Sequence, residues 1–169
     1  YGISLLYGGT GTVQLDGIAA AIEATGGKPS MLIVVGWLML AAAIVVADQI
    51  TKYAVVQHFS SNPPLAVTPF FNLVLVYNSG AAFSILSDAA GWQRGFFIAI
   101  AVIASAWIVY LLRKYPHQHL FALALSLVLA GAVGNAIDRI LFGAVIDFLD
   151  FHALGYHWPA FNVADSAIT

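Results

Sequence analysis

Four aspartates, Asp48, Asp138, Asp147 and Asp165, lie at the ends of apolar segments in a chain that is 61% hydrophobic and only 8% charged. Ionisable groups at membrane depth are costly, and those that occur there usually serve a function. Asp147 and Asp165 have apolar neighbours and no lysine or arginine within four residues on either side. These two residues are therefore the first candidates for chemistry.

Two desolvated carboxyl groups without a nearby cation have raised pKa values, and when brought together they share one proton. One carboxylate can then deprotonate a water while the other protonates a scissile carbonyl or a leaving amine. Such a pair hydrolyses peptides without a metal or a covalent intermediate. The alternative is that both residues cap helices, since Asp165 precedes Ser166 in a manner that suits an N-cap. The residue pattern alone favours neither interpretation.

The other two aspartates lie beside basic residues, which favours a structural role. Asp48 and Lys52 are four residues apart with the acid N-terminal, the best helical arrangement for an ion pair. An acid held ionised by a lysine is a poor proton shuttle. Asn135, Asp138 and Arg139 form a polar cluster at the end of an apolar segment, and we interpret it as helix packing and head-group recognition.

Composition places the chain among integral membrane proteins, because soluble domains carry about a quarter charged residues. A net charge of −2 gives no basic surface for nucleic acid. The absence of cysteine excludes disulfides, thiolate nucleophiles and cysteine metal sites. His152 and His157 are five residues apart, not the four of a helical zinc site, and are interpreted as solvated interfacial residues. We therefore expect no cofactor and no metal.

Three apolar runs predict membrane-spanning helices over residues 31–56, 95–112 and 120–137; the first is free of charge over residues 31–47 and continues helically through Asp48 and Lys52, and the other two carry no charge. The second ends before the helix-stopping Pro116. Small residues in the third run, Gly131 and Gly134, offer a face on which another helix could pack closely.

The segments between the spans differ in character. Residues 65–77 are rich in β-branched and aromatic side chains and predict a small sheet lying on the bilayer. Residues 141–164 mix aromatics, glycine and proline, which suits an interfacial segment. Residues 1–30 are too polar and glycine-rich to span, and we interpret them as an extension or linker with a short helix over 18–24. Residues 165–169 resemble the first turn of a further helix, so we expect the chain to be a fragment.

The distribution of basic residues predicts the orientation. Lys52 and Arg139 are discounted as structural partners of the adjacent acids. Of the other four basic residues, Lys28, Arg113 and Lys114 flank spans at one membrane face and Arg94 lies at the other. The face with three basic residues is expected to be cytoplasmic. Residues 58–92 and 141–164, with Asp147 and Asp165, are therefore expected on the outer side.

Five sequence blocks follow one another along the chain. The blocks are Asp48-Gln49-Ile50-Thr51-Lys52, Tyr77-Asn78-Ser79-Gly80-Ala81-Ala82-Phe83, Gly131-Ala132-Val133-Gly134-Asn135-Ala136-Ile137-Asp138-Arg139, Val145-Ile146-Asp147-Phe148 and Phe161-Asn162-Val163-Ala164-Asp165-Ser166. With these blocks, residues 31–169 resemble the lipoprotein signal peptidases, the signal peptidase II family of bacterial inner-membrane aspartic proteases.

The resemblance implies a mainly α membrane protein, a four-helix transmembrane bundle with a small extracytoplasmic β-cradle, of which the fourth helix is truncated here. It implies a catalytic pair, Asp147 and Asp165, with structural support from Asp48 and Lys52. It also implies a set of substrate-binding or supporting residues: Asn78, Gly80, Asn135, Asp138, Arg139 and Asn162. The implied partners are membrane lipids and a prolipoprotein whose lipobox cysteine carries diacylglycerol and is cut on its N-terminal side.

The truncated helix would hold Asp165 in place, so we expect this chain to be impaired as a peptidase. Two other function classes stay open at this stage. A small transporter or channel could use intramembrane carboxylates, although the sequence has no internal repeat and its acids cluster towards one surface. A structural membrane subunit is the third alternative.

Overall fold

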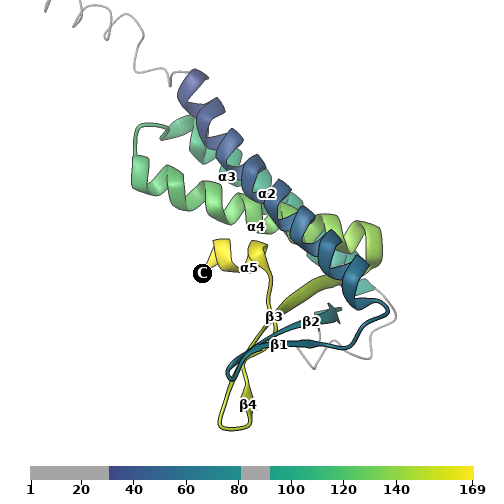
Figure 1. Ribbon diagram of the computed structural model, residues 1–169. Helices are drawn as coiled ribbons and strands as arrows, with labels where there is room; N and C mark the ends of the chain where they lie inside the picture. The colour runs from purple at the N-terminus through teal and green to yellow at the C-terminus, as the bar shows by residue number, and fades with distance from the viewer. Residues whose placement is uncertain (1–30, 81–91) are drawn as a thin grey trace, which may run out of the picture.

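A computed structural model describes residues 31–80 and 92–169 (Figure 1). Its three long helices are α2 (Met31–Phe59), α3 (Trp92–Lys114) and α4 (His119–Phe142). Each is long and apolar enough to cross a membrane; the 29 residues of α2 extend about 43 Å at 1.5 Å per residue. The three predicted spans are confirmed, and the chain is a multi-pass membrane protein.

Helix α4 is the centre of the bundle. It packs against both α2 and α3, whereas α2 and α3 make few contacts with one another. Their shared core contains Ala41, Leu112, Ala122 and Ala130, small and branched residues that let the helices approach closely. Large apolar side chains on the outer faces, such as Ile103, remain exposed in the isolated chain, as expected for helices that face lipid.

A four-stranded antiparallel sheet lies at one end of the helices (Figure 1). Its strands are, in spatial order, β1 (Leu65–Thr68), β2 (Phe71–Asn78), β3 (Val145–Ala153) and β4 (Tyr156–His157). Strands β3 and β4 are joined by Leu154 and Gly155, both with positive φ, which is the two-residue hairpin geometry that matches strand twist. The β-rich segment predicted over residues 65–77 is confirmed as β1 and β2.

The short helix α5 (Val163–Ile168) packs against α4 and α2 (Figure 1). Two glycines of α4 permit this approach. A Cβ at Gly131 would lie 2.5 Å from the Ala164 carbonyl oxygen, and a Cβ at Gly134 would lie 2.8 Å from Asp48 Oδ2. The small-residue face predicted for this helix is therefore confirmed, with α5 as its partner.

Two expectations need correction. Helix α4 extends to Phe142 and ends at Gly143, whose φ of 79° and N–H bond to the Arg139 carbonyl form a left-handed cap. Residues 141–164, expected as a single interfacial segment, are divided into a helix end, two strands and the start of α5. The extension 1–30, its short helix over 18–24, and the block residues 81–83 lie outside the described residues.

Candidate active site

A buried charge cluster joins α2 to α4. Lys52 Nζ lies 2.8 Å from Asp48 Oδ2 and 2.7 Å from Asp138 Oδ2. Gln49 Nε2 donates to Asp138 Oδ1 at 2.9 Å and to the Gly134 carbonyl at 3.3 Å. Asp48 and Asp138 are fully buried and Lys52 is 1% exposed. The predicted ion pair is present, and it includes Asp138 as a second acid.

The two acids of this charge cluster also accept hydrogen bonds from the backbone next to each candidate catalytic aspartate. Asp138 Oδ2 accepts from the N–H of Ile146 at 3.1 Å, and Asp48 Oδ1 accepts from the N–H of Ala164 at 2.8 Å. These two N–H groups belong to the residues that immediately precede Asp147 and Asp165. The cluster therefore fixes β3 and α5 relative to the helices, which is how it positions the two aspartates.

Asp147 lies on β3 and is 1% exposed. Asn78, at the end of β2, donates to its Oδ2 at 3.0 Å, and Asn162 donates to its Oδ1 at 2.8 Å. Burial, with a further contribution from the charge of Asp165, raises the pKa of Asp147 to about 6, although the two amide bonds and Lys52 oppose this rise. Asp147 therefore holds a proton more readily than an ordinary aspartate.

Asp165 lies in the first turn of α5 and is half-buried. The Asn135 amide on α4 donates to its Oδ1 at 2.7 Å. Asn162 is the N-cap of α5: its side chain accepts from the Asp165 N–H at 2.9 Å, and its own N–H donates to Asp165 Oδ2 at 3.3 Å. The expectation that Asp165 could itself be the N-cap is wrong, because Asp165 occupies the third position of this capping box.

Asn162 therefore connects the two carboxylates. Its amide nitrogen bonds Asp147 while its amide oxygen and backbone N–H hold Asp165. A second connection runs through Asn135, whose Oδ1 accepts from Lys52 Nζ at 3.1 Å while its amide nitrogen holds Asp165. The aspartates thus belong to one hydrogen-bond network with the charge cluster.

The remaining predicted residues lie around this network. Gly80 donates its N–H to Asn78 Oδ1 at 2.9 Å. Its φ of 97° favours glycine, and a Cβ at this position would lie 2.7 Å from the Phe97 ring, so there is no room for a side chain. The Arg139 guanidinium stacks 4.8 Å from the centre of the Phe97 ring and donates to the Asn135 carbonyl at 3.2 Å. All ten residues singled out from the sequence therefore lie in or beside the network.

Sequence reasoning missed two features. Gln49 was quoted only as part of a block, yet its amide bonds both acids of the charge cluster. No local sequence signal singles out Asp150, yet it is 7% exposed and paired with His157. The useful signal for Asp150 was the histidine seven residues later, which becomes its neighbour only after the hairpin closes. In residues 31–80 and 92–169, no group of three or more His, Asp or Glu side chains is arranged to hold a metal ion.

Comparison with known proteins gives a consistent result. The family model described as signal peptidase (SPase) II matches residues 40–169. The lipoprotein signal peptidase of Cupriavidus necator is 56% identical over 133 residues, which are 79% of this chain and 76% of that protein. That of Janthinobacterium sp. (strain Marseille) is 58% identical over 132 residues, covering 78% and 80% respectively.

A solved bacterial membrane enzyme, determined by the in meso method at 1.9 Å resolution, has the same fold with a TM-score of 0.69 and 37% identity. The match covers 79% of this chain and 84% of that chain. A second structure, at 2.3 Å resolution, gives a TM-score of 0.66 at the same 37% identity. The family model spans well over half of the sequence, and the chain therefore belongs to the signal peptidase II family of membrane proteases.

Proposed function

We propose that Asp147 and Asp165 form the catalytic dyad of an endopeptidase that removes signal peptides from prolipoproteins. The substrate carries a diacylglyceryl group on its lipobox cysteine, and the cut bond lies on the N-terminal side of that cysteine. The single observation that carries the proposal is the bridge made by Asn162, whose amide nitrogen bonds the Asp147 carboxylate and whose backbone N–H bonds the Asp165 carboxylate. The names of the similar proteins support the substrate class.

The two carboxyl groups divide the proton transfers between them. Asp147 is the more buried and has the raised pKa, so it holds the shared proton. Asp165 is half-buried and open to water, so it serves as the general base. The base removes a proton from a water as its oxygen attacks the scissile carbonyl carbon. Asp147 protonates the carbonyl oxygen as the tetrahedral intermediate forms. When the C–N bond breaks, Asp165 passes the proton it took from water to the departing amine, and Asp147 takes back the proton from the former carbonyl oxygen.

The neighbouring residues orient this pair. The amides of Asn78 and Asn162 hold both oxygens of Asp147, and Asn135 holds Asp165. Fixing a carboxylate with two donors sets the direction of its remaining lone pairs, which is the geometry that the attacking water needs. Gly80 donates a hydrogen bond to Asn78, and Arg139 donates one to Asn135. Both residues therefore lie next to the dyad and would line the substrate site.

The substrate arrives from the membrane. Exposed apolar faces on the three helices offer room for diacylglyceryl chains in the lipid phase. The dyad lies at the end of the bundle that carries the sheet (Figure 1), so the peptide would be cut at the membrane surface. We place this end on the extracytoplasmic side of the bacterial inner membrane because the basic residues flanking α2 and α3 are biased towards the other side.

The test is cleavage of a purified diacylglyceryl prolipoprotein by the protein in lipid, followed by gel shift and mass measurement of the released signal peptide. We expect one cut, before the modified cysteine, and no cut in the same precursor with the cysteine replaced by serine. Cleavage at another bond, or equal cleavage of the serine precursor, would refute the proposal. The comparisons give no support to a transporter or channel.

A further inference from the structure

Asp147 and Asp165 lie on the two arms of one hairpin. Strand β3 carries Asp147, the chain turns at Leu154 and Gly155, and the return arm passes through β4 to Asn162 and α5. The position of Asn162 against Asp147 therefore depends on the register between the return arm and β3. A shift of one residue in an antiparallel pair moves each side chain to the opposite face.

That register is interrupted between two fixed points. His152 pairs with His157 near the turn, and Leu149 pairs with Phe161 next to Asn162. Two residues of β3 lie between these pairs, whereas three residues of the return arm, 158–160, lie opposite them. The extra residue is a bulge, and its Pro159 has no N–H to donate. Within this stretch the Trp158 N–H still donates to the Phe151 carbonyl at 2.8 Å, so the backbone ladder between β3 and the return arm is interrupted only over residues 159 and 160.

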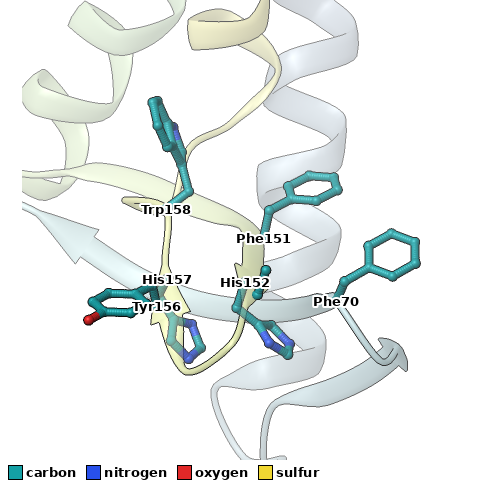
Figure 2. Close-up of a pocket in the computed structure, with 7 residues that line it drawn as sticks. Phe70, Phe151, His152, Tyr156, His157 and Trp158 are labelled. Atoms are coloured by element: carbon teal, nitrogen blue, oxygen red, sulfur yellow. The ribbon is translucent and has the colours of Figure 1, made fainter.

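One side-chain pair spans the bulge. Asp150 Oδ1 lies 2.8 Å from His157 Nδ1, and Asp150 Oδ2 accepts from the Asn72 amide at 2.8 Å. Asp150 thereby holds the return arm on one side and β2 on the other. The His157 ring is stacked on His152 with centroids 4.9 Å apart, as the adjacent rings in Figure 2 show. The two rings line an open hollow of about 450 Å³ together with the neighbouring aromatic side chains Phe70, Phe151, Tyr156 and Trp158.

The charges at this point favour the pair. Asp150 is 7% exposed, and its hydrogen bond to His157, followed by that from Asn72, lowers its pKa below the usual value. The titratable groups facing Asp150 are the two histidines, His157 on β4 and His152 on β3, and the group from β2 is the neutral Asn72. Asp150 therefore stays ionised at neutral pH and remains a strong acceptor for an imidazole N–H.

We propose that the Asp150 and His157 pair is a positioning device that fixes the register of the return arm and thereby holds Asn162 against Asp147. The proposal rests on the peptidase function proposed above. Neither residue touches the dyad or the substrate in this scheme. Their effect on catalysis passes through the bulge, Phe161 and Asn162.

Two substitutions of His157 both remove the imidazole ring but differ in whether they keep the hydrogen bond to Asp150. In His157→Asn the amide nitrogen lies where Nδ1 lies, so the bond to Asp150 is kept. In His157→Gln the amide nitrogen corresponds to Nε2, so that bond is lost. We expect kcat to fall about tenfold to a hundredfold in His157→Gln, the cost of roughly 1 Å of misplacement, and to recover to within about threefold of wild type in His157→Asn. KM should change little in either variant.

The pH profile provides a readout that a general loss of structure would not give. The bond from Asn162 lowers the pKa of Asp147, so loosening it raises that pKa. Asp147 then keeps the shared proton to higher pH, and the alkaline limb of kcat/KM moves upward in His157→Gln but not in His157→Asn. Wild-type kcat with an unmoved limb in His157→Gln, or equal losses in both variants, would overturn the proposal.

Failure of this inference can be distinguished from failure of the proposed function. Wild-type protein and Asp147→Asn are measured in the same assay. If Asp147→Asn still cleaves, the dyad itself is refuted. If Asp147→Asn is inactive while His157→Gln behaves as wild type, only the positioning role is refuted.

Discussion

The charge cluster and the candidate dyad are both made of buried carboxylates, yet their surroundings give them opposite roles. Asp48 and Asp138 are as buried as Asp147, so burial does not distinguish them. The difference is the partner, because Lys52 bonds both acids of the cluster while the dyad is held by neutral amides. The lysine ties both acids of the cluster into a salt bridge between two helices, whereas Asp147, held by amides, has a raised pKa and can exchange a proton. The bonding partner of a carboxylate, more than its burial, therefore distinguishes the structural acids from the candidate catalytic ones.

The dyad side of this comparison predicts the largest effect. Asp147→Asn and Asp165→Asn remove a proton-transfer group with almost no change in shape. We expect each to lower kcat by about a thousandfold or more, at the upper part of the range for general acid–base groups, with little loss of thermal stability. The measurements are single-turnover cleavage and thermal unfolding in the same lipid preparation. Retention of most activity in either variant would contradict the assignment.

The cluster side predicts loss of stability instead. Lys52→Met leaves two buried carboxylates without a cation, and breaking a buried ion pair costs about 3–5 kcal/mol. The matched control is the neutral triple variant Asp48→Asn, Lys52→Met, Asp138→Asn, which leaves no charge unpaired. The unfolding midpoint should fall sharply in the single variant and recover in the triple one. A single variant as stable as wild type would show that the lysine is not the structural partner.

Asn162 has a structural role as the N-cap of α5 and a role in the dyad through its hydrogen bond to Asp147. Two substitutions distinguish these roles. Asn162→Ser keeps an N-cap oxygen but is too short to reach Asp147, whereas Asn162→Ala loses both. Activity should fall by a similar factor in the two variants, about tenfold or more. Only the alanine variant should lose a further ~1 kcal/mol of stability through the missing cap. Wild-type activity in the serine variant would argue that the bridge is dispensable.

The smallest effect concerns the pH dependence. The pKa of Asp147 is raised to about 6, and with Asp147 as the proposed holder of the shared proton, kcat/KM should decline on the alkaline side of that value. Bound substrate displaces water and raises the pKa further, so the same limb in kcat should lie at higher pH. The groups facing Asp147 that set this value are Asp165, Lys52 and the two amides. A flat kcat/KM between pH 5 and 8 would not fit this assignment.

The sequence predicted much of this arrangement because its signals are local. Long uncharged runs locate α2, α3 and α4, and the spacing of Asp48 and Lys52 predicts their pairing. The residue pattern singled out Asp147 and Asp165, and the family resemblance added Asn78, Gly80 and Asn162 to the candidate site. What the sequence could not show is contact across the chain. Asp138 joins Lys52 across two helices, and Asp150 meets His157 only through a hairpin turn and a bulge.

The central claim is that Asp147 and Asp165 act as one unit, and a double-mutant cycle tests it most directly. Residues that share one catalytic step lose nearly all of its benefit with the first substitution. We predict that the double variant Asp147→Asn, Asp165→Asn cleaves diacylglyceryl prolipoprotein no more slowly than the less active of the two single variants. Losses that multiply in the double variant would mean that the two carboxylates work independently, and would contradict the account.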